Sequence, residues 1–385
     1  MSLLNQEVHF EFFGNKEFSQ FYFSVFIMTF GEALINIFVP IYLFTSGFQI
    51  YQILFFYFLV SFFFLVFSYS GAKIVSRIGE KHSILLSTPF IILFYLGLIY
   101  INSGWLVFVL LPLLLSLRLV LFNYGYHLNF INHSEKRKRG RELAVFGAIT
   151  LLATAIAPYL GGLLAKISFP LVFIISSILI IFGTIPLFFS KDRFEKLNFT
   201  LKGIYKNIFS KDNRGNFISF SGYAIESIIG RTIWPVFLII IIGTINTTGL
   251  IISLSMLISL LAFQYVGRIT DRINKVRLLK IGAILYFFAW VGRIFANTAY
   301  KVLFIDSYKN LSEKILHLPW SAHSYDLAKK SDYFEFIVSR EIVFNFIRIL
   351  IFPVLIFIFW INFYPFVISF IIASFFSLGY VFINK

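Results

Sequence analysis

The sequence contains no cysteine and little charge. Its 385 residues include no Cys, and Asp, Glu, Lys and Arg together make up only 13% of the chain. Without cysteine the chain cannot form a disulfide framework, a thiolate metal site or a cysteine nucleophile. Soluble globular domains carry about 25% charged residues. The low share here excludes an ordinary water-soluble enzyme, a disordered regulator and a typical nucleic-acid reader.

Long apolar runs take the place of the missing charge. Hydrophobic residues make up 59% of the chain and aromatic residues 20%, and the mean hydropathy is +0.85. A bilayer core of about 30 Å requires roughly 20 apolar residues per helix. Runs of this length, bounded by Gly, Pro, Asn or charged residues, predict an all-α integral membrane protein with twelve spans, at 20–45, 51–75, 83–102, 105–130, 142–165, 169–189, 217–242, 248–267, 278–297, 301–325, 341–361 and 363–383.

The basic residues lie on one side of the predicted membrane. Most of the 33 Lys and Arg residues follow spans 2, 4, 6, 8 and 10, whereas the opposite loops hold Lys166 and Lys301. Cytoplasmic loops are enriched in Lys and Arg. We therefore predict a multi-pass protein of the cytoplasmic (cell inner) membrane with both termini in the cytoplasm. The net charge of +15 then reflects topology and does not indicate nucleic-acid binding.

A polar segment divides the chain into two halves. Residues 191–216 form the longest polar stretch, in which Leu201, Ile204, Tyr205 and Ile208 recur near helical spacing with lysines between them. This pattern is typical of an amphipathic helix at a membrane surface. We predict an N-terminal six-helix bundle at 1–190, a cytoplasmic linker at 191–216 and a C-terminal six-helix bundle at 217–385.

The two halves resemble each other at a nearly constant offset. The segment 38–43 (FVPIYL) matches 233–238 (IWPVFL), and the loop 76–81 matches 271–275, both at an offset of 195. The pair Arg141-Glu142 matches Arg340-Glu341 at an offset of 199. These matches predict two six-helix halves with the same orientation, related by a pseudo-twofold axis along the membrane normal, an arrangement known in transporters.

The loop after span 8 resembles a known signature. Gly267, Asp271 and Arg272 fall in the order G-x-x-x-D-R, which looks like the signature between the second and third helices of each half in the major facilitator superfamily. The first-half copy retains Arg77 and Gly79 but has Ala72 and Ser76 instead of Gly and Asp. The resemblance implies a transporter that works by alternating access, with Arg77, Gly79, Gly267, Asp271 and Arg272 in a cytoplasmic gate loop.

Span 5 carries a second resemblance. Pro158, Gly161 and Gly162 end a helix rich in small residues, similar to the antiporter signature of the same superfamily. The resemblance implies proton-linked export. Close helix packing explains the same small residues without any role in coupling.

Ten ionisable residues fall within the predicted spans. Each costs about 2.5–3.5 kcal/mol if it is left unpaired at the centre of a bilayer, so these residues must face water or one another. The resemblance implies that spans 1, 4, 7 and 10, which carry eight of the ten, line a central cavity. The ten are Glu32, Arg118, Glu226, Arg231, Arg293, Asp306, Lys309, Glu313, Lys314 and Arg348.

Three carboxylates are candidates for proton coupling. A carboxylate in a low-dielectric cavity can take up and release a proton during transport, and Glu32 is the first candidate, followed by Glu226 and Glu313. In the alternative interpretation Glu32 is a fixed partner of Arg118 or Arg231. Six basic against four acidic residues favour an anionic or zwitterionic solute. Candidates for the substrate cavity are Asn36, Arg118, Arg231, Asp306, Lys309, Asn310, Lys314 and Trp234.

No catalytic or cofactor motif stands out. The histidines do not form a metal-like cluster and the sequence has no phosphate-binding loop, so we expect neither a metal, a cofactor nor an enzyme activity. The leading hypothesis is a monomeric, proton-coupled secondary transporter, with a small solute, protons and the lipid bilayer as its partners. Export of amphipathic or drug-like compounds, facilitated transport or import of a small organic anion or sugar, and a non-transporting receptor of the same fold remain alternatives.

Overall fold

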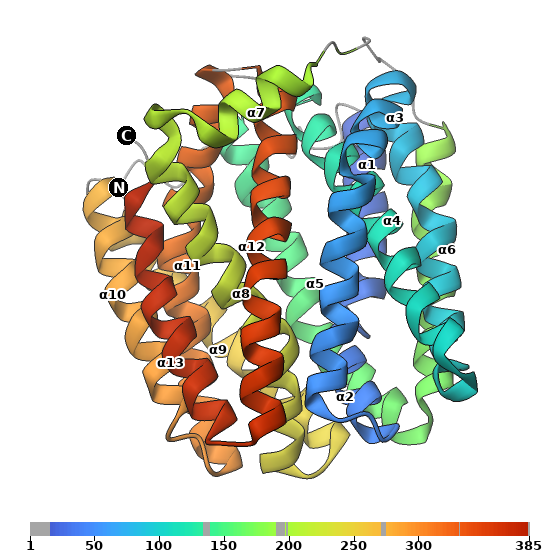
Figure 1. Ribbon diagram of the computed structural model, residues 1–385, viewed down its shortest axis with the longest axis vertical. Helices are drawn as coiled ribbons and strands as arrows, with labels where there is room; N and C mark the ends of the chain where they lie inside the picture. Colours follow the sequence, from blue (N-terminus) through green and yellow to red (C-terminus); the bar gives the residue numbers. More distant parts are fainter. Residues whose placement is uncertain are drawn as a thin grey trace, which may run out of the picture.

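The computed structural model describes residues 16–133, 139–189, 197, 199–270, 275–330 and 332–383. This part of the chain is almost entirely helical, and the long helices run side by side along the longest axis of the molecule (Figure 1). The helices are α1 Lys16–Ala33, α2 Phe38–Thr45, α3 Ile50–Leu98, α4 Trp105–His133, α5 Arg139–Ile167, α6 Phe169–Phe189, α7 Leu201–Phe209, α8 Arg214–Ile242, α9 Ile245–Thr270, α10 Lys275–Arg293, α11 Ala299–Lys330, α12 Tyr333–Ile361 and α13 Pro365–Ser377, with short 3₁₀ turns η2 Ile101–Ser103, η3 Lys211–Asn213 and η4 Leu378–Phe382.

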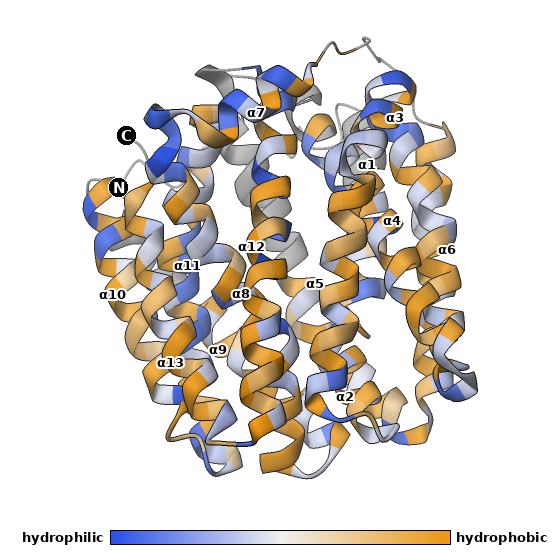
Figure 2. Ribbon diagram, viewed as in Figure 1, coloured by the Kyte–Doolittle hydropathy of each residue, from blue (hydrophilic) through white to orange (hydrophobic). Residues whose placement is uncertain are grey.

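Within the described residues, eight helical segments are long and apolar enough to cross a membrane. One of them, the 49-residue α3, covers the second and third predicted spans. The fifth predicted span is represented by a shorter apolar stretch, Leu152–Ile167. The ninth and tenth correspond to α10 and α11, which are long enough to cross a membrane but carry at least three charged residues in any stretch of 18. The expected all-α membrane architecture is confirmed, and hydrophobic residues cover most of the long helices (Figure 2).

The first predicted span is broken in its middle. We expected one helix over 20–45, but α1 ends at Ala33 and α2 begins at Phe38. Pro40 explains the break, because it has no N–H to donate to the carbonyl of Asn36 and its ring crowds that carbonyl. The N–H groups of Ile35 and Phe38 instead bond to carbonyls three residues earlier. The polar side chain of Asn36 is thereby exposed in the middle of the span.

The turns between spans use residues that tolerate a positive φ. Gly79, with φ of 82°, interrupts α3 where the second and third spans meet. Gly104, with φ of 131°, and Asn362, with φ of 60°, separate the next two nearly continuous pairs of spans. Glycine adopts these values without a steric cost, and asparagine tolerates the left-handed region better than most residues.

Most helices pack within their own half, and the largest contacts between the halves involve α5, α9, α3 and α12. In the first half α3 packs on α4 and α1 on α6, and in the second half α10 packs on α11 and α8 on α13. Between the halves, α5 contacts α9 and α3 contacts α12. This packing agrees with the expected two bundles, and the pseudo-twofold axis stays a prediction.

The polar linker contains a short helix at one end of the molecule. Thr200 caps the start of α7, because its hydroxyl accepts from the N–H of Gly203. Ile204 of this helix is buried. The backbone N–H of Thr200 also donates to Glu335 Oε1 of α12, 2.7 Å away. Leu201, Tyr205 and Phe209 are exposed, as expected for an amphipathic helix at an interface. We call this end of the molecule the α7 end; it is the predicted cytoplasmic end.

Candidate functional site

In the first half, the two charged residues midway along the spans form an ion pair. Arg118 lies midway along α4 with 2% of its side chain exposed, and its guanidinium pairs with Glu32 of α1. Its Nη1 also donates to Ser87 Oγ at 3.3 Å, and the guanidinium lies 3.6 Å from the centre of the Phe122 ring. Glu32 is therefore arranged as in the alternative interpretation, as a partner of Arg118. Its role in transport stays a prediction.

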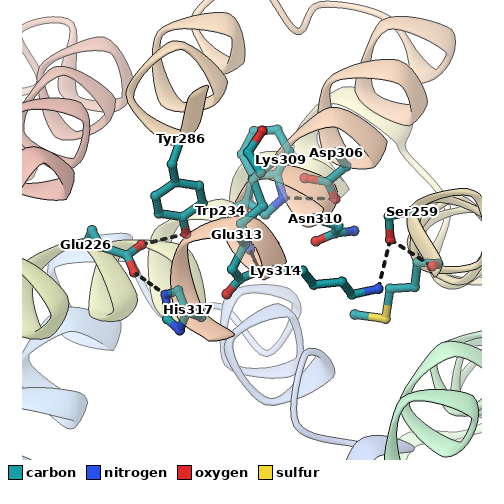
Figure 3. A network of polar contacts seen from close by, with 12 residues as sticks. Glu226, Trp234, Ser259, Tyr286, Asp306, Lys309, Asn310, Glu313, Lys314 and His317 are labelled. Atoms are coloured by element: carbon teal, nitrogen blue, oxygen red, sulfur yellow. Dashed lines mark hydrogen bonds and ion pairs between the residues drawn. The ribbon is translucent and has the colours of Figure 1, made fainter. Parts of the chain in front are cut away.

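In the second half, the candidates Asp306, Lys309, Asn310 and Glu313 form a polar stripe along α11 that faces more than one neighbouring helix. Lys309 Nζ lies 2.7 Å from Glu313 Oε2, one helical turn along, and both side chains are partly exposed. One turn earlier, Asp306 is buried and faces α8 and α10 (Figure 3). Asn310 faces α9, where its Nδ2 donates to Ser255 Oγ at 3.1 Å. The residues of the stripe therefore face three neighbouring helices: Asp306 faces α8 and α10, and Asn310 faces α9.

Asp306 and Trp234 hold a buried arginine. Arg293 Nη2 of α10 lies 2.9 Å from Asp306 Oδ1, and Trp234 Nε1 is 3.4 Å from Asp306 Oδ2. The guanidinium lies 3.9 Å from the Trp234 ring centre and 4.3 Å from that of Trp290. Cation–π contacts of this kind stabilise a desolvated charge. Asp306 and Trp234, which the sequence indicated as cavity candidates, are both buried in this cluster.

Glu226 is surrounded by groups that sequence analysis did not identify. Its Oε2 accepts from the Tyr286 hydroxyl of α10 at 2.9 Å, and its Oε1 accepts from the Tyr380 hydroxyl of η4 at 2.6 Å. His317 Nε2 of α11 lies 2.9 Å from the Tyr380 oxygen and 3.8 Å from Glu226 Oε1. Glu226 is buried, whereas a quarter of the His317 side chain is exposed.

The sequence carried a signal for His317 and none for the two tyrosines. His317 continues the α11 stripe by one turn, four residues after Glu313, so extending the same periodicity would have included it. Tyr286 and Tyr380 are two of 20 tyrosines in a chain with 53 phenylalanines. Nothing in the sequence distinguishes them from packing residues.

Three cations midway along their helices bond to hydroxyl groups. Arg231 Nη2 of α8 donates to the Tyr223 hydroxyl at 3.2 Å, and Arg348 Nη2 of α12 donates to Ser227 Oγ at 3.4 Å. Lys314 Nζ of α11 donates to Ser259 Oγ of α9 at 3.3 Å (Figure 3). In the part of the chain that the structure describes, no carboxylate forms an ion pair with these three cations.

Arg231 and Asn36 are exposed although their helices pass through the interior. Both lie near the middle of their spans, at positions related by the predicted repeat, and the four residues that follow Arg231 are buried. Arg231 is also near enough to Glu226 and Glu313 to interact with both electrostatically. Together with Arg348 of α12, charged side chains of three helices therefore lie around this exposed guanidinium.

At the α7 end, a polar cluster joins the two halves. Arg340 Nη2 of α12 donates to His127 Nε2 of α4 at 2.9 Å and to Glu341 Oε1 at 3.2 Å. His127 Nδ1 lies 3.1 Å from the Tyr325 hydroxyl of α11, and Asn123 Nδ2 lies 3.5 Å from Glu341 Oε2. This cluster connects α4 with α11 and α12, and sequence analysis did not predict it.

The predicted gate loop is described only in part. Arg77 is exposed at the α7 end beside Gly79, where the helix direction changes. Gly267 lies in the last turn of α9. Asp271 and Arg272 lie outside the described residues, so the gate role of all five residues stays a prediction.

The small-residue motif of α5 lies where the halves meet. A Cβ on Gly161 would meet the carbonyl oxygen of Leu34, and one on Gly162 would lie 3.1 Å from the carbonyl oxygen of Ile245 at the start of α9. In the opposite direction, a Cβ on Gly249 of α9 would meet the carbonyl oxygen of Pro158. Close backbone packing is therefore a sufficient reason for these residues.

Among the described residues, no group of three or more His, Cys, Asp or Glu side chains is arranged to hold a metal ion. The polar centre of the molecule is instead built from ion pairs, hydroxyl groups and aromatic rings. Such a centre can bind a polar solute and hold a proton.

Comparison with known proteins supports the fold. The family model of the Major Facilitator Superfamily matches residues 125–305, which confirms the expected resemblance. No curated protein matches the chain in sequence.

Several solved transporters have a similar structure. The nucleoside transporter NupG is 12% identical with a TM-score of 0.66, over 96% of this chain and 98% of that chain. A POT family transporter in complex with a thioalcohol-conjugated peptide is 13% identical with a TM-score of 0.71, over 96% of each chain. A POT family transporter in complex with 5-aminolevulinic acid is 13% identical with a TM-score of 0.67, over 94% of each chain. The chain therefore has the fold of major facilitator transporters.

Proposed function

We propose that this protein is a secondary active transporter that moves a small anionic or zwitterionic solute by alternating access, driven by protons. The observation that carries the proposal is the group of three mid-helix cations, Arg231, Lys314 and Arg348, which bond to hydroxyls and form no ion pair among the described residues. In the predicted topology this group lies near the middle of the cytoplasmic membrane, and the protein acts as a monomer with both termini in the cytoplasm.

The charge balance supports an anionic solute. In the second half, five cations (Arg231, Arg293, Lys309, Lys314 and Arg348) face three carboxylates (Glu226, Asp306 and Glu313), and in the first half Glu32 neutralises Arg118. The surplus is two positive charges, which an intramembrane site must compensate with water or with a bound anion. A guanidinium binds a carboxylate or phosphate with two parallel hydrogen bonds. Arg231 is exposed and so available for such a bond.

Contacts between the halves at both ends support alternating access. The cluster around His127 and Arg340 joins α4 to α12 at the α7 end. At the other end, Phe38 and Ile41 of α2 pack against Ile239 of α8, and the N–H of Tyr159 of α5 donates to Ser253 Oγ of α9 at 2.8 Å. Opening either end requires one of these two sets of contacts to separate.

A second candidate function is export of amphipathic compounds. It is favoured by an aromatic groove of about 480 Å³ between α3, α4 and α12, at the end opposite α7. Phe48, Tyr51, Phe55, Trp105 and Phe108 line this groove together with Gln52 and Asn102. The groove has no charged lining residue, which favours an apolar solute or a lipid chain over an anion.

Transport by the purified protein in lipid vesicles separates the two candidates. A panel of small organic anions, amino acids, nucleosides and cationic amphiphiles is measured with and without a pH gradient. We expect a small anion or zwitterion to accumulate only when the gradient is present. Movement of cationic amphiphiles alone would support the second candidate, and movement of no solute would contradict both.

Arg231→Gln tests whether the Arg231 guanidinium binds the solute. Hydrogen bonds to charged groups contribute about 1.5–3 kcal/mol, so removal of the guanidinium should lower the apparent affinity for the anion by about tenfold or more. Lys301→Gln is the matched control, because it removes the same charge from an exposed residue at the end opposite α7. Equal affinities in the two variants would contradict a role for Arg231 in binding.

A further inference from the structure

We propose that Tyr380 is a proton bridge between His317, which receives protons from water, and the buried Glu226. The inference rests on the proposed proton coupling and names the residues that would carry the proton. Glu226 was already a candidate from sequence, whereas His317 and Tyr380 gain a role only from their positions in the structure.

The hydroxyl of Tyr380 lies between the two titratable groups. It is 2.6 Å from Glu226 Oε1 and 2.9 Å from His317 Nε2, whereas the direct separation of Nε2 and Oε1 is 3.8 Å. The direct separation exceeds hydrogen-bond distance, so the hydrogen-bonded route for a proton runs through the Tyr380 oxygen. Figure 3 shows Glu226 between Tyr286 and His317.

The two ends of this route differ in their access to water. His317 has 24% of its side chain exposed and Glu226 has 3%, while Tyr380 is fully buried. The rings of Tyr223, Tyr286, Trp320 and Tyr380 surround the imidazole at centroid distances of 5.1–6.3 Å. Glu226 is thus almost fully buried, and His317 is the exposed group of the pair, through which we infer that protons enter.

The proton step balances with the groups present. A proton from water binds His317 and makes it an imidazolium whose Nε2–H points at the Tyr380 oxygen. The N–H bond of His317 then breaks as the tyrosine oxygen takes its proton, and the original O–H bond of Tyr380 breaks as its proton passes to Glu226 Oε1. The products are neutral imidazole, tyrosine with a new proton and a protonated carboxyl group. Both hydrogen bonds persist with their directions reversed.

The transfer replaces two opposite charges with two neutral groups. Protonated Glu226 no longer compensates the cations around it. Proton binding therefore raises the net positive charge that faces the solute. The charged and titratable side chains that interact with this route are Tyr223 and Arg231 of α8, Tyr286 and Arg293 of α10, Lys309 and Glu313 of α11 and Arg348 of α12.

Tyr286 provides a matched control. Its hydroxyl donates to the other oxygen of Glu226 at 2.9 Å, and among the described residues it forms no hydrogen bond with His317. Tyr286→Phe therefore removes one hydrogen bond from the carboxylate and leaves the bridge intact. Tyr380→Phe also removes one hydrogen bond from the carboxylate but interrupts the route, and it keeps the ring that packs on Trp320 at a centroid distance of 5.1 Å.

The test is a pH jump on the purified full-length protein in lipid nanodiscs, followed by time-resolved infrared spectroscopy. A caged acid releases protons, and the band of the protonated carboxyl group reports Glu226, with Glu226→Gln identifying that band by its loss. We expect Tyr380→Phe to slow appearance of the band by about tenfold or more, which corresponds to about 1.4 kcal/mol of added barrier. Tyr286→Phe should shift the band and keep its rate within about twofold.

His317→Gln is the second variant, and it keeps the proposal testable if Tyr380→Phe does not fold. It removes the water-accessible group and should slow the same band. Equal rates in wild-type protein, Tyr380→Phe and His317→Gln would overturn the bridge, as would a Glu226 band that never appears between neutral and acidic pH.

The result is independent of the solute. If the band behaves as expected but a pH gradient drives no uptake in vesicles, the bridge stands and the proposed coupling fails. If a pH gradient drives uptake equally in Tyr380→Phe and wild-type protein, the coupling stands and the bridge is overturned.

Discussion

The guanidinium of Arg118 on α4 forms an ion pair with the carboxylate of Glu32 on α1, in the middle of both spans. Arg118 is buried and also bonds to Ser87, so the pair connects three helices of the first half. Removing one partner of a buried pair leaves an uncompensated charge and costs about 3–5 kcal/mol. We therefore expect the pair to stabilise this half, whatever its part in transport.

Glu32→Gln should lower the unfolding temperature of the purified protein. Arg118→Gln should do the same, and the double variant should lose less stability than the sum of the two single variants, because no unpaired charge remains. In vesicles, Glu32→Gln should retain pH-driven accumulation per folded protein, whereas Glu226→Gln should lose it. If only Glu32→Gln lost pH-driven accumulation, Glu32 rather than Glu226 would be the proton carrier.

Asp306→Asn should destabilise the second half more than it affects solute binding. Arg293 would keep its contacts with Trp234 and Trp290 but lose its counter-ion, at a cost of about 3–5 kcal/mol. Glu313→Gln is the comparison, because the Lys309–Glu313 pair is partly exposed and exposed pairs contribute about 0–1 kcal/mol. Denaturation of both variants in detergent tests the difference, and equal losses would argue against the buried arginine cluster as a structural element.

Gly249→Ala should separate α9 from α5. Its Cβ would meet the carbonyl oxygen of Pro158, and overpacking of this kind costs about 1–3 kcal/mol. Gly230→Ala is the control in a neighbouring helix, because its Cβ would lie 3.5 Å and 3.6 Å from atoms of the Trp290 ring, at ordinary contact distance. This control should gain up to about 1 kcal/mol from helix propensity. A thermal shift of the same sign in both variants would contradict close packing at Gly249.

Acid should weaken the cluster at the α7 end. Arg340 donates to His127 Nε2, so this nitrogen must be unprotonated in the observed arrangement. As the pH falls and His127 takes up a proton, two donors face each other and the bond is lost; Glu341 Oε1, 4.0 Å from Nε2, offsets part of the repulsion. The two halves should therefore separate more readily at this end at low pH.

Pulsed electron paramagnetic resonance measures this separation. The absence of native cysteine allows spin labels at Lys73→Cys on α3 and Ala322→Cys on α11, both exposed positions. Acid and Arg340→Leu should each raise the population at long distance by about tenfold, since charged hydrogen bonds contribute about 1.5–3 kcal/mol. His127→Asn should remove the pH dependence. Distance distributions that respond to neither acid nor Arg340→Leu would show that the cluster does not hold this end closed.

Much of the fold could be predicted because its signals are local. Apolar runs of about 20 residues must form helices in a bilayer, since no water is available to bond an open backbone. The breaks at Asn102-Ser103-Gly104 and at Asn362 were also expected, and the structure has a turn at each. The break between α1 and α2 was missed although Pro40 was visible, because many membrane helices accommodate a proline without interruption.

The sequence predicted many of the residues that belong to the candidate site, but it did not predict which of them form ion pairs with each other. The cost of an unpaired charge identified the ten ionisable residues, and the stripe on α11 followed from helical spacing. The pairing of Glu32 with Arg118 and of Arg293 with Asp306 depends on which helices are neighbours and how they are rotated. Tyr286, Tyr380 and His317 became part of the site only because α10, η4 and α11 meet beside Glu226.

The sequence by itself determined that this chain is a helical membrane protein with charges that must be sheltered from lipid, because hydrophobic length and the cost of burying charge depend on residues near one another in the chain. Only the tertiary structure decided which cation pairs with which carboxylate, and which cations form no ion pair among the described residues. That decision depends on distances of about 3 Å between side chains of different helices, and a single sequence does not contain the rotation and register of those helices.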